Sequence, residues 1–248
     1  MLKFSDSSLK SGIVEMIDAN CGTNSVNYPI TEKTRDINLA LDRAFALIFQ
    51  VGGTWQFDDS SHTDYPIITT DIVSGQRDYS FTTDETGNLI LDIYKVMVAD
   101  SNGIFFEVFP TDQQGNVPLS MTDGQNTTGS VQTYDKTGNG IFLDLIPNYN
   151  RTGGLKIWIS RTGSYFTCGT TMDAMTSAQA LKKPGFAGLF HEYCVLRPSF
   201  QYAYRKDKKN VNILKSEMLE MENEIQNYYK SRERDVVKTL ISRSNNYK

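Results

Sequence analysis

His191 and Cys194 are residue types that could form a nucleophile and its base. They stand three residues apart in the segment His-Glu-Tyr-Cys, a spacing that lets two side chains touch on a helix. Catalysis would also need an orienting acid, and no local cysteine-enzyme signature surrounds Cys194. Both residues lie among large apolar side chains, where a hydrogen-bonded histidine and a buried cysteine are the commoner use. We therefore expect both to pack in a core, and we predict that the chain is not an enzyme.

A group of carboxylates beside a histidine could bind a cation. Asp58, Asp59 and Asp64 lie close to His62, but the segment lacks the spacing and the glycine of an EF-hand loop. A solvated loop that leads into a strand is the commoner use of such a segment. The sequence also lacks the P-loop, HExxH, GxSxG and CxxC motifs. We predict no catalytic, metal-binding or cofactor-binding residue and no cofactor.

Aromatic side chains offer a different binding chemistry. The chain has 13 Phe, 13 Tyr and 2 Trp, and several stand at strand-like positions: Trp55, Phe57, Tyr65, Tyr79 and Trp158. Aromatic residues of this kind could line a sugar-binding surface, although packing in a core or a subunit interface is their commoner use. A tail-associated module that binds host glycans or a receptor is therefore the alternative function.

Composition indicates a globular protein with an uneven charge. The chain of 248 residues is 39% apolar and 22% charged, which suffices for one or two domains. No apolar run approaches the roughly 18–20 residues of a membrane span, and the N-terminus does not resemble a secretory signal. Three scattered cysteines favour a reducing cytoplasm as the place of folding. Residues 182–248 carry 14 Lys and Arg against 8 Asp and Glu, whereas residues 1–181 carry 11 against 21.

The middle of the chain has the pattern of a β unit. Between Trp55 and about Thr167, short apolar runs alternate with turn residues, and Asp100-Ser-Asn-Gly is a strong hairpin signal. A second turn, Lys136 to Gly140, joins another pair of runs. Seven runs suggest a small antiparallel sandwich or barrel. The predicted strands are 67–73, 77–81, 89–99, 104–109, 130–134, 141–145 and 155–166.

Helical patterns occupy both ends of the chain. Residues 31–50 form an amphipathic pattern, and a second helix is expected from Phe186 to Arg205, kinked or divided at Pro198. The third, from Asp207 to about Arg234, carries apolar residues at heptad spacing. This stripe, which we expect to pack the helices or a subunit interface, comprises Val211, Leu214, Met218, Met221, Ile225 and Tyr228.

The predicted fold class is therefore α+β. The N-terminal helix and the long C-terminal helices should form a helical bundle base that carries an inserted antiparallel β domain. The predicted division is an N-terminal segment and base helix at 1–54, a β domain at 55–167, a helical base at 168–235 and an extended tail at 236–248.

Two stretches carry a family resemblance: Trp55 to Phe81, which opens the β part, and Lys183 to Tyr193 with its continuation to Tyr204. In residue texture and order they resemble the ring or head–tail adaptor (connector) proteins of tailed bacteriophages, especially those of crAss-like phages. The resemblance covers most of residues 31–235. It implies a structural virion protein at the head–tail junction, made in the host cytoplasm, with a helical bundle, an inserted β domain and no catalysis.

The resemblance also implies partners. They are a homo-oligomeric ring, expected to be a dodecamer, the portal protein, further tail or ring proteins, and double-stranded DNA that passes through the channel without sequence-specific binding. No membrane contact is expected. The residues that we expect to face the portal or a neighbouring subunit are charged or lie in the tail: Arg205, Lys206, Lys208, Lys209, Lys238, Arg243, Tyr247 and Lys248.

Overall fold

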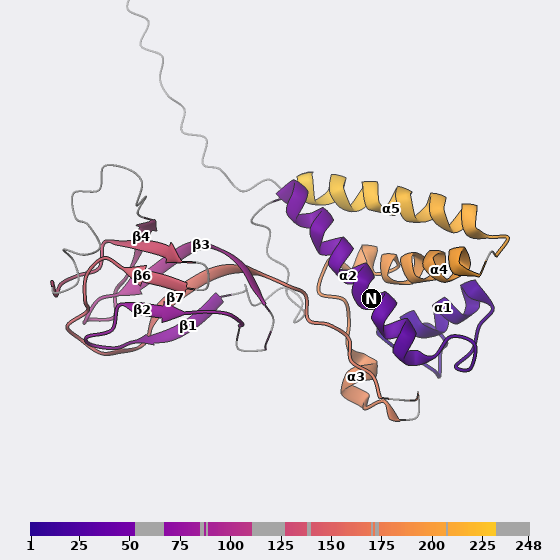
Figure 1. Ribbon diagram of the computed structural model, residues 1–248, viewed down its shortest axis with the longest axis horizontal. Coiled ribbons are helices and arrows are strands. Elements are labelled where there is room, and N and C mark those ends of the chain that lie inside the picture. Colours follow the sequence, from indigo (N-terminus) through magenta and orange to yellow (C-terminus); the bar gives the residue numbers. More distant parts are fainter. Residues whose placement is uncertain are drawn as a thin grey trace, which may run out of the picture.

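The computed structural model describes residues 1–52, 67–84, 87, 89–110, 127–137, 140–169, 171, 174–206 and 208–231. Helices come first and last along the chain, and strands lie between them. In Figure 1 the strands gather in one unit and the helices α1, α2, α4 and α5 in another. The predicted mixed α+β class is confirmed.

The helices of the described chain follow local sequence signals. α1 ends before Gly22, whose φ of 61° is the left-handed conformation that glycine adopts at a helix end. α3 begins with a capping box, in which the Thr176 side chain accepts from Gln179 N and the Gln179 side chain accepts from Thr176 N. The bounds are α1 Ile13–Cys21, α2 Ile30–Gly52, α3 Ser177–Leu181, α4 Tyr193–Arg205 and α5 Val211–Ser231.

One apolar core joins the N-terminal and C-terminal helices. Ile37, Leu41 and Ile48 of α2 lie in the same buried cluster as Val195 of α4 and Ile225 of α5. Residues from α1 and from the segment before it, including Phe4, complete this cluster. The two ends of the chain therefore depend on each other for burial of their apolar faces.

The strands of the described residues form one curled seven-stranded sheet in the order β1-β7-β3-β4-β5-β6-β2. Its buried side chains, such as Val96, Leu155 and Ile157, make a second cluster that shares no residue with the helical one. The bounds are β1 Ile67–Ile72, β2 Asp78–Ser80, β3 Ile90–Ala99, β4 Phe105–Pro110, β5 Thr133–Thr137, β6 Gly140–Leu143 and β7 Arg151–Arg161.

The expected antiparallel sandwich or barrel needs correction in one respect. β4 and β5 run parallel, with Phe109 opposite Thr133, while the other pairs between the described strands are antiparallel. A parallel neighbour requires the chain to return to the starting end of the sheet, and residues 111–132 are long enough for such a crossover. The result is a curled sheet, like half of a barrel, instead of two packed sheets.

The predicted hairpin at Asp100 is confirmed. The Asp100 carboxylate accepts hydrogen bonds from the backbone N–H groups of Asn102, at 2.9 Å, and Ile104, at 2.8 Å. Gly103 has a φ of 89°, which a residue with a Cβ rarely adopts. This turn joins β3 to β4. The turn predicted between Lys136 and Gly140 likewise joins the antiparallel pair β5 and β6.

The helix expected from Phe186 begins later than predicted. Gly188–Phe190 is a 3₁₀ turn, and α4 starts at Tyr193. Tertiary contacts override helical propensity there, because His191 Nε2 lies 3.0 Å from Phe186 O and Gly188 lies against the side chain of Met1. Pro198 lies inside α4 and does not divide it.

The separate clusters predict separable effects of core substitutions. Leu41→Ala removes a fully buried side chain of the helical cluster, and Ile157→Ala removes one of the sheet cluster. Each should lower stability by about 2–5 kcal/mol. Hydrogen-exchange mass spectrometry should show faster exchange in peptides from α4 and α5 for the first variant and from β3 and β7 for the second.

Each variant serves as the control for the other. Equal acceleration in both sets of peptides, for both variants, would show that the two clusters unfold as one and would contradict this prediction.

Candidate functional site

His191 and Cys194 are packed as the sequence analysis expects. His191 is 2% exposed and Cys194 is fully buried. Burial lowers the pKa of His191 and raises the pKa of the Cys194 thiol, so the neutral form of each is favoured. A nucleophilic pair would need the opposite shifts, a thiolate beside an imidazolium. The burial and the pKa shifts of His191 and Cys194 therefore indicate a packing role.

The loop with Asp58, Asp59, His62 and Asp64 lies outside the described residues, as do Trp55, Phe57 and Tyr65. Within the described ranges, no group of three or more His, Cys, Asp and Glu side chains is placed to hold a metal ion. No helix in those ranges combines the length and apolar character that crossing a membrane requires.

Of the five aromatic residues considered for sugar binding, the structure describes Tyr79 and Trp158, and both are at least partly covered. Tyr79 is buried, and Trp158 is half-buried on β7. Lys95 Nζ lies 5.2 Å from the centre of the Trp158 ring and 3.4 Å from Glu107 Oε2. Cations over ring faces stabilise the sheet locally. A sugar that stacked on this face of the ring would have to displace Lys95.

The heptad stripe lies on the core side of α5. Leu214, Met218 and Ile225 are buried in the helical cluster. Val211, Met221 and Tyr228 are partly buried against it. These six residues therefore pack α5 onto the helices of its own chain.

Glu222 is a buried charge that the heptad stripe does not include. It is 9% exposed, and its carboxylate accepts hydrogen bonds from Tyr193 Oη at 2.6 Å and from Arg43 Nη2 at 3.2 Å. Arg197 Nη1 lies 3.4 Å from the same carboxylate. Burial acts to raise the pKa of Glu222, but the hydrogen bonds from Arg43 and Tyr193 outweigh it, so the pKa lies below its ordinary value. This carboxylate joins α2, α4 and α5.

Two further buried charges lie on α2. Lys33 is 1% exposed, and its Nζ lies 2.7 Å from the Asp18 carboxylate of α1. Asp36 is 2% exposed, accepts a hydrogen bond from Tyr28 Oη at 2.5 Å, and forms an ion pair with Arg205 at the end of α4. Burial and the bond to Asp36 raise the pKa of Tyr28, which keeps its proton for this bond.

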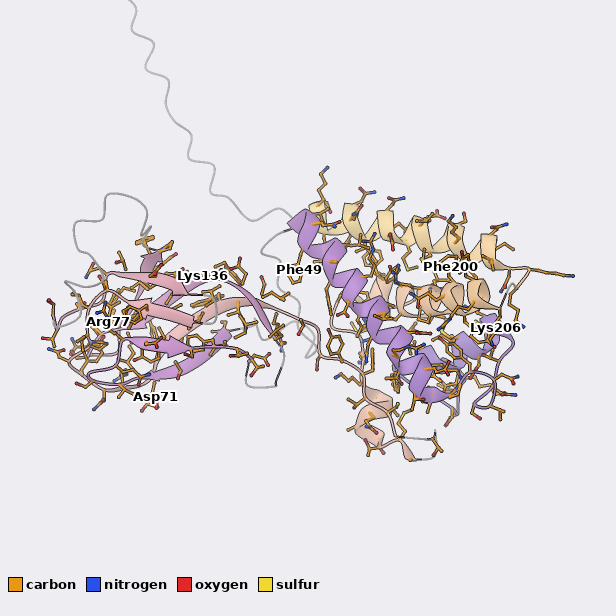
Figure 2. All side chains as sticks on the ribbon, viewed as in Figure 1. Phe49, Asp71, Arg77, Lys136, Phe200 and Lys206 are labelled. Atoms are coloured by element: carbon orange, nitrogen blue, oxygen red, sulfur yellow. The ribbon has the colours of Figure 1, made fainter. Side chains whose placement is uncertain are left out.

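The connection between α4 and α5 carries unpaired cations. Lys206, Lys208 and Lys209, which we call the basic turn, are exposed, and their side chains form no ion pair or hydrogen bond with the residues that the structure describes. Figure 2 shows Lys206 at the end of the helical part farthest from the sheet. Arg205 differs from these lysines because it forms an ion pair with Asp36, although its side chain remains 43% exposed.

The remaining residues predicted to contact the portal or a neighbour, Lys238, Arg243, Tyr247 and Lys248, lie outside the described residues. The sequence does not single out Lys33, Asp36 and Glu222 as buried, because their ion-pair partners Asp18, Arg205 and Arg43 lie far from them along the chain. A signal existed for Glu222, which lies four residues after Met218 and three before Ile225, on the same helix face.

The chain matches no known protein-family model, and no curated protein matches it. The case for its function therefore depends on its own residues and their geometry.

The network around Glu222 predicts a pH-dependent contribution to stability. Because the pKa of Glu222 is lower in the folded chain, this contribution is full above the unfolded value of about 4.3 and is lost as pH falls through the folded pKa. Glu222→Gln should lower the free energy of unfolding by about 1–3 kcal/mol at pH 7. In urea denaturation, the difference from wild type should shrink towards zero below pH of about 4.

Glu224→Gln is the matched control, because Glu224 is exposed on the same helix without a side-chain partner in the described part of the chain. It should change stability by less than about 0.5 kcal/mol. Equal losses for the two variants, or a loss for Glu222→Gln that does not depend on pH, would refute the role given to this carboxylate.

Proposed function

We propose that this protein is a structural virion protein, a connector ring subunit that docks on the portal, continues the DNA channel and attaches the tail. The stretches Trp55 to Phe81 and Lys183 to Tyr204 support this through their resemblance to phage head–tail adaptors. The helix–strand–helix order of the described chain agrees with the organisation that the resemblance implies.

The observation that carries the proposal is the joint core of the two chain ends. Apolar residues of α1 and α2 and of α4 and α5 bury each other, and the strands between them have a core of their own. We propose on this basis that the helices act as a helical bundle base that carries the β unit as an insertion. A ring subunit needs such a rigid base, because its contacts with neighbours must repeat at one fixed angle for the ring to close.

The charge of the chain suits a conduit better than a DNA-binding protein. The net charge is −4, although each contact between a lysine or arginine and a phosphate would add affinity for DNA. The DNA therefore passes through the channel without being held and without sequence readout. The partners are further copies of the chain in a ring, the portal, and the next ring or tail protein, in a virion assembled in the host cytoplasm.

The connector proposal predicts a defined complex with the portal of the same phage. Native mass spectrometry of the full-length protein mixed with that portal should give a closed complex, with a dodecamer of the chain expected. The portal of an unrelated tailed phage is the control and should give no complex. A chain that remains monomeric and unbound beside its own intact portal would contradict the proposal.

Glycan binding distinguishes the connector proposal from its alternative, because only a glycan-binding module should bind sugars saturably. A connector should show no saturable binding on a glycan array as full-length protein, and the lysine over Trp158 agrees with this expectation for that ring. Saturable binding that Trp158→Ala abolishes, with Tyr79→Phe as the buried control, would favour the alternative and count against the connector.

A further inference from the structure

The outer side of α5 carries a line of carboxylates that we call the acidic stripe: Glu217, Glu220 and Glu224. Their spacing of three and four residues places them on one helix face, away from the buried Leu214, Met218 and Ile225. All three are exposed and have no side-chain partner among the described residues. Like charges at this spacing destabilise a helix, so the chain keeps an unfavourable arrangement here.

The basic turn is also placed unfavourably for its own helix. Lys208 and Lys209 lie three and two residues before Val211, the first residue of α5, and cations at a helix N-terminus oppose the helix dipole. Two apolar side chains beside the turn are exposed, Tyr204 by 71% and Ile213 by 62%. Exposed apolar side chains of this kind add apolar contact area to a protein interface.

Within one chain these two charged surfaces cannot neutralise each other. Lys209 and Glu217 are eight residues apart, so a straight helix separates them by roughly 12 Å along its axis. No ion pair joins the basic turn to the acidic stripe in the structure of the described residues. Among the described residues, neither surface has an opposite charge bound to it, so each can meet one on another molecule.

We propose that the basic turn of one copy docks on the acidic stripe of a second copy, with Tyr204 and Ile213 at the edge of the contact. This inference rests on the proposed function, because it identifies the two different surfaces that a ring needs for its head-to-tail contacts. A second copy of the chain is the partner that fits, because each chain carries both a positive and a negative surface. The ion pair between Asp36 and Arg205 holds the turn at a fixed position on its base.

Charge reversal of full-length protein tests this docking. The reversed turn carries Lys206→Glu, Lys208→Glu and Lys209→Glu; the reversed stripe carries Glu217→Lys, Glu220→Lys and Glu224→Lys. Sedimentation velocity should show self-association weakened about tenfold or more in each variant. A mixture of the two variants, or one chain with all six changes, should regain wild-type association, because opposite charges then face each other again.

The matched control is the pair Lys215→Glu and Lys230→Glu, which changes exposed charges on α5 outside both surfaces and should leave association unchanged. Circular dichroism verifies that each variant is folded. Raising the salt from 0.1 M to 1 M shortens the screening length from about 10 Å to about 3 Å and should weaken the wild-type association.

The outcomes separate this docking from the connector role. Reversed variants that associate as tightly as wild type would overturn the docking and leave the ring intact as a proposal. If both variants lose self-association and their mixture does not regain it, the docking is also overturned. That result would indicate another partner for the lysines, such as DNA. Restoration without portal binding would support the docking and refute the connector. A wild-type chain that stays monomeric with and without the portal would overturn both.

Discussion

The helical part depends on charges that α2 buries. Lys33 and Asp36 are almost completely covered, and a buried charge is tolerated only when an opposite charge and hydrogen bonds satisfy it. Asp18 must therefore approach from α1 and Arg205 from α4, while Arg43 of α2 must reach Glu222 of α5. We infer that these ion pairs, together with the apolar core, favour one arrangement of the helices.

The same helix receives the chain as it leaves the sheet. Asn38 exchanges hydrogen bonds with the backbone of Phe166, at 3.0 Å and 2.9 Å, and Tyr165 Oη donates to Asp42 at 2.7 Å. Gly163 lies so close to Phe45 that a Cβ there would overlap its ring. These contacts fix the segment that follows β7 against α2. In a connector subunit, they would link the β unit to the helical part that carries the basic turn.

Sequence patterns predicted the features that depend on local chemistry. The hairpin at Asp100 and the apolar stripe of α5 follow from turn residues and periodicity. The parallel pairing of β4 with β5 did not, because it depends on where a long crossover returns. Lys33 and Asp36 resemble solvent-facing residues in the sequence, since their burial depends in part on the distant partners Asp18 and Arg205. Long-range partners of this kind leave no periodic signal.

Electron cryomicroscopy of the protein assembled on its own portal can show whether the helical part is a rigid base whose surfaces repeat around a ring. We expect a closed ring in which each helical part keeps the arrangement described above and touches its neighbours through its outer charged surfaces. Single copies bound at irregular positions, or subunits that contact each other through the β unit while the helices stand apart, would contradict it.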